Sequence, residues 1–504
     1  MSLRDDLSRY LDAGFPILYI NTFEETKVEE LLKTIEDRKR IFVWSLAKGY
    51  GEYSTTNNEW LVPLAKDEST DLNNVLNLKL IDDSELKRSI FIIKDVHVVL
   101  ENKEVVSQIK EIATKISAGL DCNIIFLSSV MMIPKELEKY ITILENDYLT
   151  FDDITSIIKK FLIENGLPSL SEQLIEEMAI AFKGLSEFEI LNLLALSVAD
   201  DGDLTKKDLK LIFEQKQQMI KKSGILEMVP VKESIDDIGG LENLKNWLQR
   251  KSIVYKNMKK AEHFGVDMPK GVLVAGIPGC GKSLCAKAVA SLFEVPILRL
   301  DVGKLMGKYL GESEANLRKA INMADAISPC VLWIDELEKA FAGIGSESGH
   351  EVTTRLFGTF LTWMQEKTSS TFVVATANDI TKLPPELLRK GRFDEIFFVD
   401  LPNKEEREKI LSIHIKKRRS NDYVNLEKEI GVLASMTEGY SGADIEGVIK
   451  DSVEYAFVQG NDRLTSEDIK EAIRNTNSLS VIMKDSISQM RKEYDRRKLK
   501  NASK

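Results

Sequence analysis

The residues with the clearest chemical potential form a glycine-rich segment in the second half of the 504-residue chain. The segment consists of Gly276, Ile277, Pro278, Gly279, Cys280, Gly281, Lys282 and Ser283. This is the GxxxxGK[ST] spacing, in which glycines allow backbone N–H groups to surround a phosphate. The lysine of such a loop meets the β- and γ-phosphates, and the hydroxyl after it binds Mg²⁺. We therefore expect ATP and magnesium to bind here.

Two carboxylates follow an apolar stretch that ends at Ile334. We expect Asp335 to bind the metal together with Ser283, and Glu336 to polarise the attacking water. A second apolar stretch leads to Asn378, whose amide is suited to hold the same water. The sequence thus predicts a hydrolytic site that is assembled from three separate segments.

Apolar runs and amphipathic stretches alternate around these residues, as in a parallel sheet covered by helices. The run 271–275 leads directly into the glycine-rich segment, and a helical pattern from Leu284 to Phe293 follows it. The motif requires this strand–loop–helix context. Leu284, the first residue of that helical pattern, completes the nucleotide-binding segment.

With these motifs, residues 234–475 resemble the AAA branch of the AAA+ ATPases. The segment Ile235–Gly240 is similar to the family's entry segment, in which Ile238 and Gly239 would line the adenine. Further matches are Asn378 (sensor 1) and the pair Gly442 and Ala443 (the lid turn against the nucleotide). The resemblance implies an ATP hydrolase.

The segment Leu388–Asp394 looks like the family's paired arginine fingers, which here are Arg389 and Arg392. By resemblance they would reach the γ-phosphate of ATP in the neighbouring subunit. A finger supplied in trans accelerates other NTPases ~10³-fold or more. The resemblance therefore implies a closed ring, a homo-hexamer.

Lys308, Tyr309 and Leu310 stand where the family carries its pore loop. An aromatic side chain there would grip extended polypeptide, because it offers contact area without demanding a sequence. Gly343–His350 is expected to be a second pore segment. The resemblance thus favours a protein as substrate or partner.

Two departures from the family pattern have consequences. Met364-Gln365-Glu366 stands where many relatives carry an acidic residue followed by glycine between subunits, which puts tight coupling of subunits in doubt. Cys280 occupies a loop position usually held by a small hydroxyl or apolar residue. Either its size is simply tolerated, or its oxidation blocks the loop.

The two halves of the chain resemble each other at three places in the same order: 133–137 and 383–387, 183–190 and 438–445, 204–210 and 464–470. We predict an α/β fold of two tandem P-loop-type modules, each with a small helical lid. The whole chain looks most like the two-module AAA ATPases encoded in cyanobacteria and plastids. Expected boundaries are 1–215 (first module with lid), 216–233 (linker), 234–412 (ATPase α/β part), 413–478 (lid) and 479–504 (charged helix or tail).

The first module is expected to be degenerate and non-catalytic. Lys94 stands where the metal-binding aspartate belongs, and a cation there would repel Mg²⁺. The segment 21–27 contains no glycine and two acidic residues, so it would not admit a phosphate. Ser128 aligns with Asn378, and no arginine-finger segment follows Leu137. We expect a platform for substrate, partner or ring assembly.

Composition excludes several classes of protein function. The formal net charge of −11 argues against a protein that coats nucleic acid. The four cysteines and four histidines show no zinc-type spacing. No apolar stretch approaches the ~20 residues that cross a bilayer, so we expect a cytoplasmic protein without a membrane partner.

Three functions remain open. The first is an ATP-driven machine that remodels or threads proteins, as Tyr309 favours. The second is a regulatory or adaptor ATPase that changes shape without unfolding anything. The third, a nucleic-acid motor, is disfavoured by the acidic balance.

Overall fold

The computed structural model describes residues 3–22, 24–35, 39–54, 59–61, 70–81, 83–145, 148–222, 224–231, 233–305, 312–340, 351–389 and 391–504. The chain divides into two compact units, Met1–Tyr148 and Leu149–Lys504. Each unit is described by itself.

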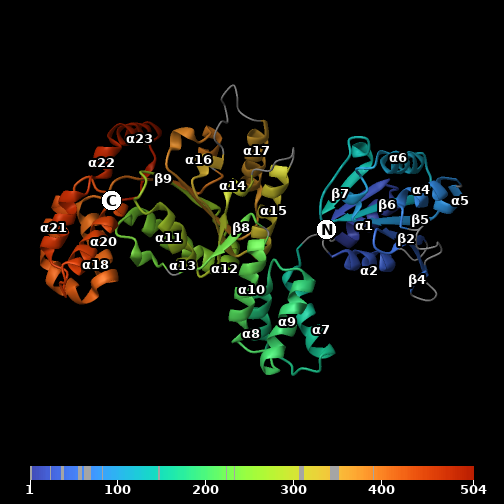
Figure 1. Cartoon of the computed structure of the whole chain (residues 1–504), viewed down its shortest axis with the longest axis horizontal. Coiled ribbons are helices and arrows are strands. Elements are labelled where there is room, and N and C mark those ends of the chain that lie inside the picture. The colour runs from blue at the N-terminus through green and yellow to red at the C-terminus, as the bar shows by residue number, and fades with distance from the viewer. Residues whose placement is uncertain are drawn as a thin grey trace. The chain divides into compact units, whose positions relative to one another are not determined.

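The first unit is a sheet with helices on both faces (Figure 1). The order of its described strands is β4-β3-β2-β5-β6-β1-β7, and all pairs from β2 to β7 are parallel. Helices α1 and α2 pack on one face, and α4 and α6 pack on the other. The elements are α1 (Leu3–Asp12), β1 (Ile17–Asn21), α2 (Glu25–Ile35), β2 (Arg40–Ser45), β3 (Gly49–Ser54), β4 (Glu59–Leu61), α4 (Leu72–Ile81), α5 (Asp83–Leu86), β5 (Ser89–Lys94), α6 (Lys103–Ser117), β6 (Cys122–Ser128) and β7 (Ile141–Glu145).

The second unit begins with four helices and continues into a second covered sheet. The order of its described strands is β14-β13-β9-β12-β11-β10-β8. The helices are α7 (Phe151–Glu164), α8 (Glu172–Phe182), α9 (Glu187–Asp201), α10 (Asp208–Lys222), α11 (Glu242–Lys256), α12 (Met258–His263), α13 (Lys282–Phe293), α14 (Val302–Leu305), α15 (Glu312–Ile327), α16 (Leu337–Ala340) and α17 (Glu351–Glu366). The strands are β8 (Leu226–Val229), β9 (Gly271–Gly276), β10 (Ile297–Leu300), β11 (Cys330–Ile334), β12 (Thr371–Ala377) and β13 (Glu395–Val399).

The two sheets share one topology, which confirms the predicted duplication. Five neighbouring strands in each sheet are parallel: β2, β5, β6, β1 and β7 in the first, and β10, β11, β12, β9 and β13 in the second. Numbered in chain order within each unit, both sets have the spatial order 2-3-4-1-5. In each unit a helix follows the first of these strands, α2 after β1 and α13 after β9. The chain is therefore built from tandem P-loop-type α/β modules.

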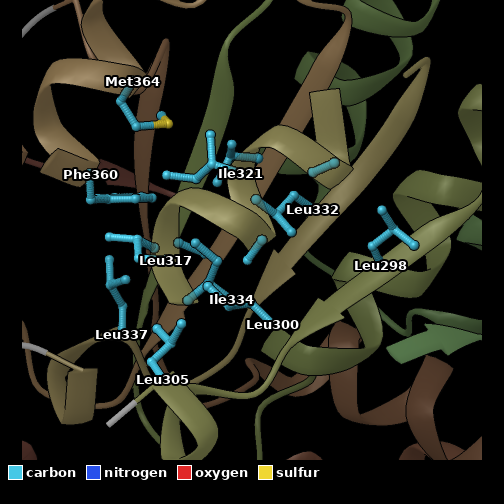
Figure 2. Packing of buried hydrophobic residues seen from close by; sticks show 14 of the residues in the cluster. Leu298, Leu300, Leu305, Leu317, Ile321, Leu332, Ile334, Leu337, Phe360 and Met364 are labelled. Atoms are coloured by element: carbon cyan, nitrogen blue, oxygen red, sulfur yellow. The ribbon is translucent and has the colours of Figure 1, made fainter. Parts of the chain in front are cut away.

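The core of the second sheet lies in two apolar layers. Helices α11 and α13 cover one face, where aromatic side chains of β11, β12 and β13 are buried. Helices α15 and α17 cover the other, with leucines and isoleucines from β10 and β11 beneath them (Figure 2). The strands are buried on both faces, as in parallel sheets generally, and this anchors the loops at their carboxyl ends.

A separate group of helices forms the lid (Figure 1). Its members are α18 (Lys404–Leu426), α19 (Ile430–Met436), α20 (Gly442–Val458) and α21 (Ser466–Asn475). Capping boxes begin three of these helices, with Asn403, Ser441 and Thr465 as the N-caps. Each box satisfies two backbone donors that a helix start leaves without partners.

The helices α7–α10, predicted as the lid of the first module, belong to the compact second unit. Lys183 Nζ donates to Ser328 O at 2.9 Å, just before β11. Ile220 of α10 joins the core beneath β11, and α10 leads into β8, which pairs antiparallel with β10. The segment expected as a linker thus contains a helix end and a strand of the ATPase sheet.

The end of the chain, expected as a charged helix or tail, contains a charged helix and a short strand. Helices α22 (Leu479–Ile482) and α23 (Lys484–Arg497) lead to β14 (Lys500–Asn501), which extends the sheet beside β13. Ala502 is fully buried in the core under α11. The charged pattern concealed this strand because it has only two residues and neither is buried.

Candidate functional site

The glycine-rich segment forms a tight loop between β9 and α13. Gly276, Gly279 and Gly281 have φ angles of 145°, 74° and 85°, which favour glycine. A Cβ at Gly276 would also clash with Val399 O of β13. The loop therefore needs glycine at these places, and it presents backbone N–H groups at the N-terminus of α13.

Lys282 is nearly buried and lies inside this loop. Its Nζ donates to Gly276 O at 2.9 Å and to Ile277 O at 2.7 Å. Burial lowers the pKa of Lys282 to about 8, against the attraction of nearby carboxylates. A buried ammonium held only by carbonyls is well placed to exchange them for phosphate oxygens.

Ser283 and Asp335 meet below the loop. Ser283 Oγ donates to Asp335 Oδ1 at 3.2 Å, although the two residues come from α13 and from the end of β11. The same Asp335 oxygen accepts from Thr376 Oγ1 of β12. A hydroxyl and a carboxylate at this spacing are suitable oxygen ligands for Mg²⁺.

Glu336 and Asn378 form the next pair. Asn378 Nδ2 donates to Glu336 Oε1 at 3.1 Å, and Lys339 Nζ lies 2.6 Å from Glu336 Oε2. Glu336 has a left-handed backbone with φ 52°, which costs a non-glycine residue about 1–2 kcal/mol. The Glu336 N–H donates to Thr376 Oγ1 at 3.1 Å. The structure thus brings together the residues that the sequence predicts for metal binding and water activation.

Glu338 is a further carboxylate that the motifs did not indicate. It is 6% exposed, and its Oε1 accepts from the Asn378 backbone N–H at 3.0 Å. Its Oε2 is buried and has no hydrogen-bond partner among the described residues. Burial raises the pKa of Glu338, which favours its protonated form.

Cys280 keeps its thiol protonated. Burial raises its pKa to about 12, and the thiolate is the form that oxidants attack. The environment therefore favours simple size tolerance over redox blocking of the loop.

The lid lies directly against the loop. Ala443 N donates to Gly279 O at 2.9 Å, and a Cβ at Gly442 would lie 3.1 Å from the same oxygen. Ile410 of α18 contacts Gly239 and approaches Gly442, so it joins the predicted adenine segment to the lid. One turn further along α18, the buried His414 Nδ1 has no partner among the described residues. Neither Ile410 nor His414 belongs to a recognisable motif.

Ile238 is buried beneath α11, and Lys245 Nζ donates to its carbonyl. An open hollow of about 660 Å³ borders Ile238 and Gly239 and extends to Ser412 and Tyr423 of the lid. No residue of the glycine-rich loop lines it, so the hollow is separate from the phosphate side of this segment.

Arg389 and Arg392 lie before β13, away from the loop of their own chain. Arg389 is exposed. Arg392 Nη2 lies 3.5 Å from Gln365 Oε1, and its buried Nε has no partner among the described residues. Asp394 Oδ2 accepts from the N–H groups of Lys270 and Gly271, which fixes this segment to the start of β9.

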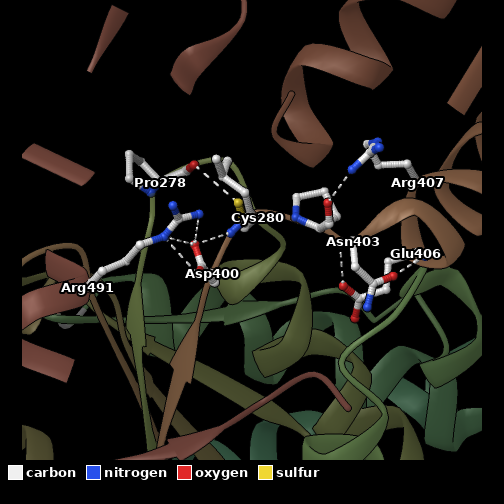
Figure 3. Close-up of polar contacts among 9 residues, drawn as sticks. Pro278, Cys280, Asp400, Asn403, Glu406, Arg407 and Arg491 are labelled. Carbon is white, nitrogen blue, oxygen red and sulfur yellow. Dashed lines mark hydrogen bonds and ion pairs between the residues drawn. The ribbon is translucent and has the colours of Figure 1, made fainter. Parts of the chain in front are cut away.

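The C-terminal segment supports the loop from behind. Arg491 of α23 makes a two-pronged ion pair with Asp400, at 2.9 to 3.1 Å, beside Cys280 and Pro278 (Figure 3). Ala502 O accepts from two N–H groups at the start of α11, those of Asn243 and Leu244. The sequence offers no motif for this contact.

The corresponding edge of the first unit carries different chemistry. Three residues join β1 to α2, whereas five join β9 to α13. Lys94 pairs with Glu29 and lies 3.6 Å from Glu25, both on α2. Burial raises the pKa of Glu25, against the attraction of Lys94.

Strand pairing aligns the two units residue by residue. Asp95 has a left-handed φ of 47°, like Glu336, which supports the match of Lys94 with Asp335. Ile93 pairs with Phe126, and Ile334 pairs with Ala375. Leu127 therefore corresponds to Thr376. Ser129, not Ser128 as predicted, corresponds to Asn378.

Lys308, Tyr309, Leu310 and the segment Gly343–His350 lie outside the described residues. No helix in the described part of the chain is long and apolar enough to cross a membrane.

Comparison with known proteins agrees with this site. Residues 272–401 match the profile "ATPase family associated with various cellular activities (AAA)", and residues 429–471 match "AAA+ lid domain". Residues 3–146 and 152–223 match the N-terminal and second domains of SpoVK-like AAA ATPases.

Similar proteins span the whole chain. An "Uncharacterized AAA domain-containing protein ycf46" of Guillardia theta is 38% identical over 97% of this chain and 94% of its own length. Its namesake in Pyropia yezoensis is 36% identical over the full length of both chains. The "Proteasome-activating nucleotidase" of Saccharolobus solfataricus is 32% identical over 57% of this chain and 72% of its own. These matches cover the nucleotide loop, the carboxylates and the lid, and the chain therefore belongs to the AAA ATPase family.

Proposed function

We propose that the second module binds ATP with Mg²⁺ and hydrolyses it within a ring of identical subunits, and that this turnover drives the remodelling of a protein. The observation that carries the proposal is the grouping of these residues at one edge of the second sheet. There the glycine-rich loop, the Ser283–Asp335 pair and the Glu336–Asn378 pair lie next to each other.

The loop and Lys282 would hold the phosphates. Three glycines open the backbone, and the Lys282 ammonium neutralises charge where the β- and γ-phosphates meet. Ser283 and Asp335 would hold Mg²⁺, which when bound neutralises the charge that develops on the phosphate oxygens. These oxygen donors fit that metal's preference.

Glu336 would orient and polarise the attacking water. Its Oε1 is held by Asn378 at 3.1 Å, so the amide can share the water with the carboxylate. The Lys339 ion pair occupies the other oxygen of Glu336. Oε1 still has a second lone pair on the side of Asn378, and it would accept the proton of the water.

Arg389 and Arg392 support a ring. They precede β13 at its amino end, whereas the loop follows β9 at its carboxyl end, and the two strands are parallel neighbours. The arginines therefore lie at the edge of the sheet opposite the copy's own loop, where a second copy could meet them. A site completed by a neighbour agrees with the closed, head-to-tail assembly of a hexamer.

The first module would serve as a non-catalytic platform. Its short connection leaves little room for a phosphate, and Lys94 with Glu25 and Glu29 fills the edge where nucleotide would bind. Its intact sheet supports a role in binding a partner or in assembly.

Protein remodelling is favoured over a nucleic-acid motor. The net charge is −11, and in the basic run at Lys416–Arg419 both arginines pair with acids. Relatives named as a nucleotidase and as "ATP-dependent zinc metalloprotease FtsH" match the ATPase half of the chain. Tyr309→Ala separates threading from a regulatory role, because under threading ATP turnover persists while the cellular function fails. Unimpaired function in that variant would favour the regulatory ATPase.

The decisive test uses two variants. Lys282→Ala should lose nucleotide binding, whereas Glu336→Gln should bind ATP and hydrolyse it at least ~10²-fold more slowly. Nucleotide binding and phosphate release measure the two effects separately. Normal turnover in either variant would overturn the site. Proteins that co-purify with the ATP-bound Glu336→Gln ring, but not with Lys282→Ala, identify the client.

A further inference from the structure

We propose that Thr376 is a positioning residue for hydrolysis: its hydroxyl orients the metal-binding carboxylate of Asp335 and holds the backbone of Glu336. The inference rests on the proposed ATP hydrolysis and adds a residue to it that no motif marks. In this role Thr376 acts through its two neighbours, Asp335 and Glu336.

The Thr376 hydroxyl both donates and accepts a hydrogen bond. The side chain is 2% exposed, on the central strand β12. Its Oγ1 donates to Asp335 Oδ1 and accepts from the Glu336 N–H at 3.1 Å. A hydroxyl has one proton and two lone pairs, so a single threonine can serve both partners at once. Valine has nearly the same shape but can serve neither.

The position of Thr376 explains why it reaches this site. It lies two residues before Asn378, so both side chains leave the strand on the same face. Asn378 holds the Glu336 carboxylate, and Thr376 holds the peptide N–H of the same residue. Thr376 and Asn378 thus hold the backbone and the carboxylate of Glu336 against the carboxyl end of β12.

The first module supplies an internal comparison. Leu127 corresponds to Thr376 by strand pairing, and Lys94 replaces the metal-binding aspartate. The left-handed turn nevertheless remains, with Asp95 at φ 47°. The turn therefore forms without a hydroxyl at the position that corresponds to Thr376. What distinguishes the second module is the link from that hydroxyl to a carboxylate, which points to a role in the chemistry rather than in the fold.

The experiment compares Thr376→Val and Thr376→Ser in the full chain, with Thr371→Val as the matched control. Thr371 is equally buried on the same strand, but its hydroxyl bonds Asp325 at the opposite end. Thr376→Val should lower kcat about 10- to 100-fold and raise the half-saturating Mg²⁺ concentration, as loss of a partner behind a metal ligand does. The KM for ATP should stay within about threefold, because the phosphate loop is unchanged.

Thr376→Ser should recover most of the activity, since it restores the hydroxyl, and Thr371→Val should keep the kcat of the natural protein. If a thermal unfolding experiment shows that Thr376→Val is not folded, Thr376→Ala replaces it, and the same loss of kcat is expected. The inference is overturned if kcat survives without the hydroxyl, if Thr371→Val loses as much, or if serine fails to rescue. A natural protein without ATPase activity would instead overturn the proposed function.

Discussion

Mixing two inactive variants should restore ATP hydrolysis, because the arginines and the phosphate loop lie at opposite edges of one sheet. In the parallel pair β9–β13, Val272 pairs with Glu395 and Gly276 pairs with Val399. Four strand steps of ~3.3 Å separate these pairs, which places about 13 Å of sheet between the arginine segment and the loop of the same copy. Arg389 and Arg392 can therefore reach such a loop only in a neighbouring copy.

The first variant, Glu336→Gln, keeps its arginines, and the second, Arg389→Ala with Arg392→Ala, keeps its carboxylate. The arginine variant alone should lose ~10³-fold or more in turnover, and Glu336→Gln alone at least ~10²-fold. In a closed ring each site meets the arginines of one neighbour. At equal mixing, half of the sites keep Glu336 and half of these meet intact arginines, so about a quarter of the natural turnover should return. Gln365, in place of the usual coupling signal, favours sites that act independently.

The assay is phosphate release at constant total protein over a range of mixing ratios, with ring size checked by light scattering. Activity should rise to a maximum at equal mixing. A variant carrying all three changes is the matched control, because its mixture with Glu336→Gln has no intact site and must stay inactive. Mixed rings that are no more active than their separate components would refute the reasoning.

Three further predictions concern protonation. The dissociation constant for ATP, measured by calorimetry, should be flat below about pH 8 and rise up to about tenfold per pH unit above it, because the free Lys282 ammonium then loses its proton. A constant affinity through that range would contradict the buried lysine. Because burial raises the pKa of Glu338, the folded state loses stability as pH rises through that pKa. Glu338→Gln should therefore gain thermal stability relative to the natural protein as pH increases, and an advantage that shrinks would be inconsistent with this. Burial lowers the pKa of Lys216 to about 7 from 10.5, so stability rises with pH between these values. Lys216→Met should stabilise most below pH 7 in denaturant titrations, and a benefit independent of pH would reject the assignment.

The parts of the site that could be predicted from the sequence are those whose chemistry is local. A phosphate loop needs its glycines, lysine and serine within one turn of chain, so their spacing is a signature by itself. The duplication was visible for the same reason, since corresponding turns keep their residues. Strand topology then confirmed it.

The residues that were not predicted make contacts with residues far away in the sequence, and no motif spacing reveals such contacts. Thr376 bonds residues that follow the neighbouring strand, and Ile410 contacts both the adenine segment and the lid. Ala502 accepts hydrogen bonds from the start of α11. The nearby bond from Asn243 to Ser503 spans 260 positions of the chain. The fold alone decides these contacts. Period-two alternation on β12 could have pointed to Thr376, but only once Asn378 was known to face the site.

The two modules separate what the fold requires from what the chemistry requires. Both keep the strand order, the left-handed turn after the third strand and a helix after the first. They differ in the charged side chains at the edge of the sheet beside that helix. Among the described residues, the Lys282 ammonium and the Asp335 carboxylate of the second module have no ion-pair partner, whereas in the first module Lys94 and Glu29 neutralise each other. A buried ion pair is costly to break when only one partner is removed. Restoring nucleotide binding to the first module would therefore require replacing both charges together with a longer, glycine-containing loop, and a change at Lys94 alone should only destabilise it.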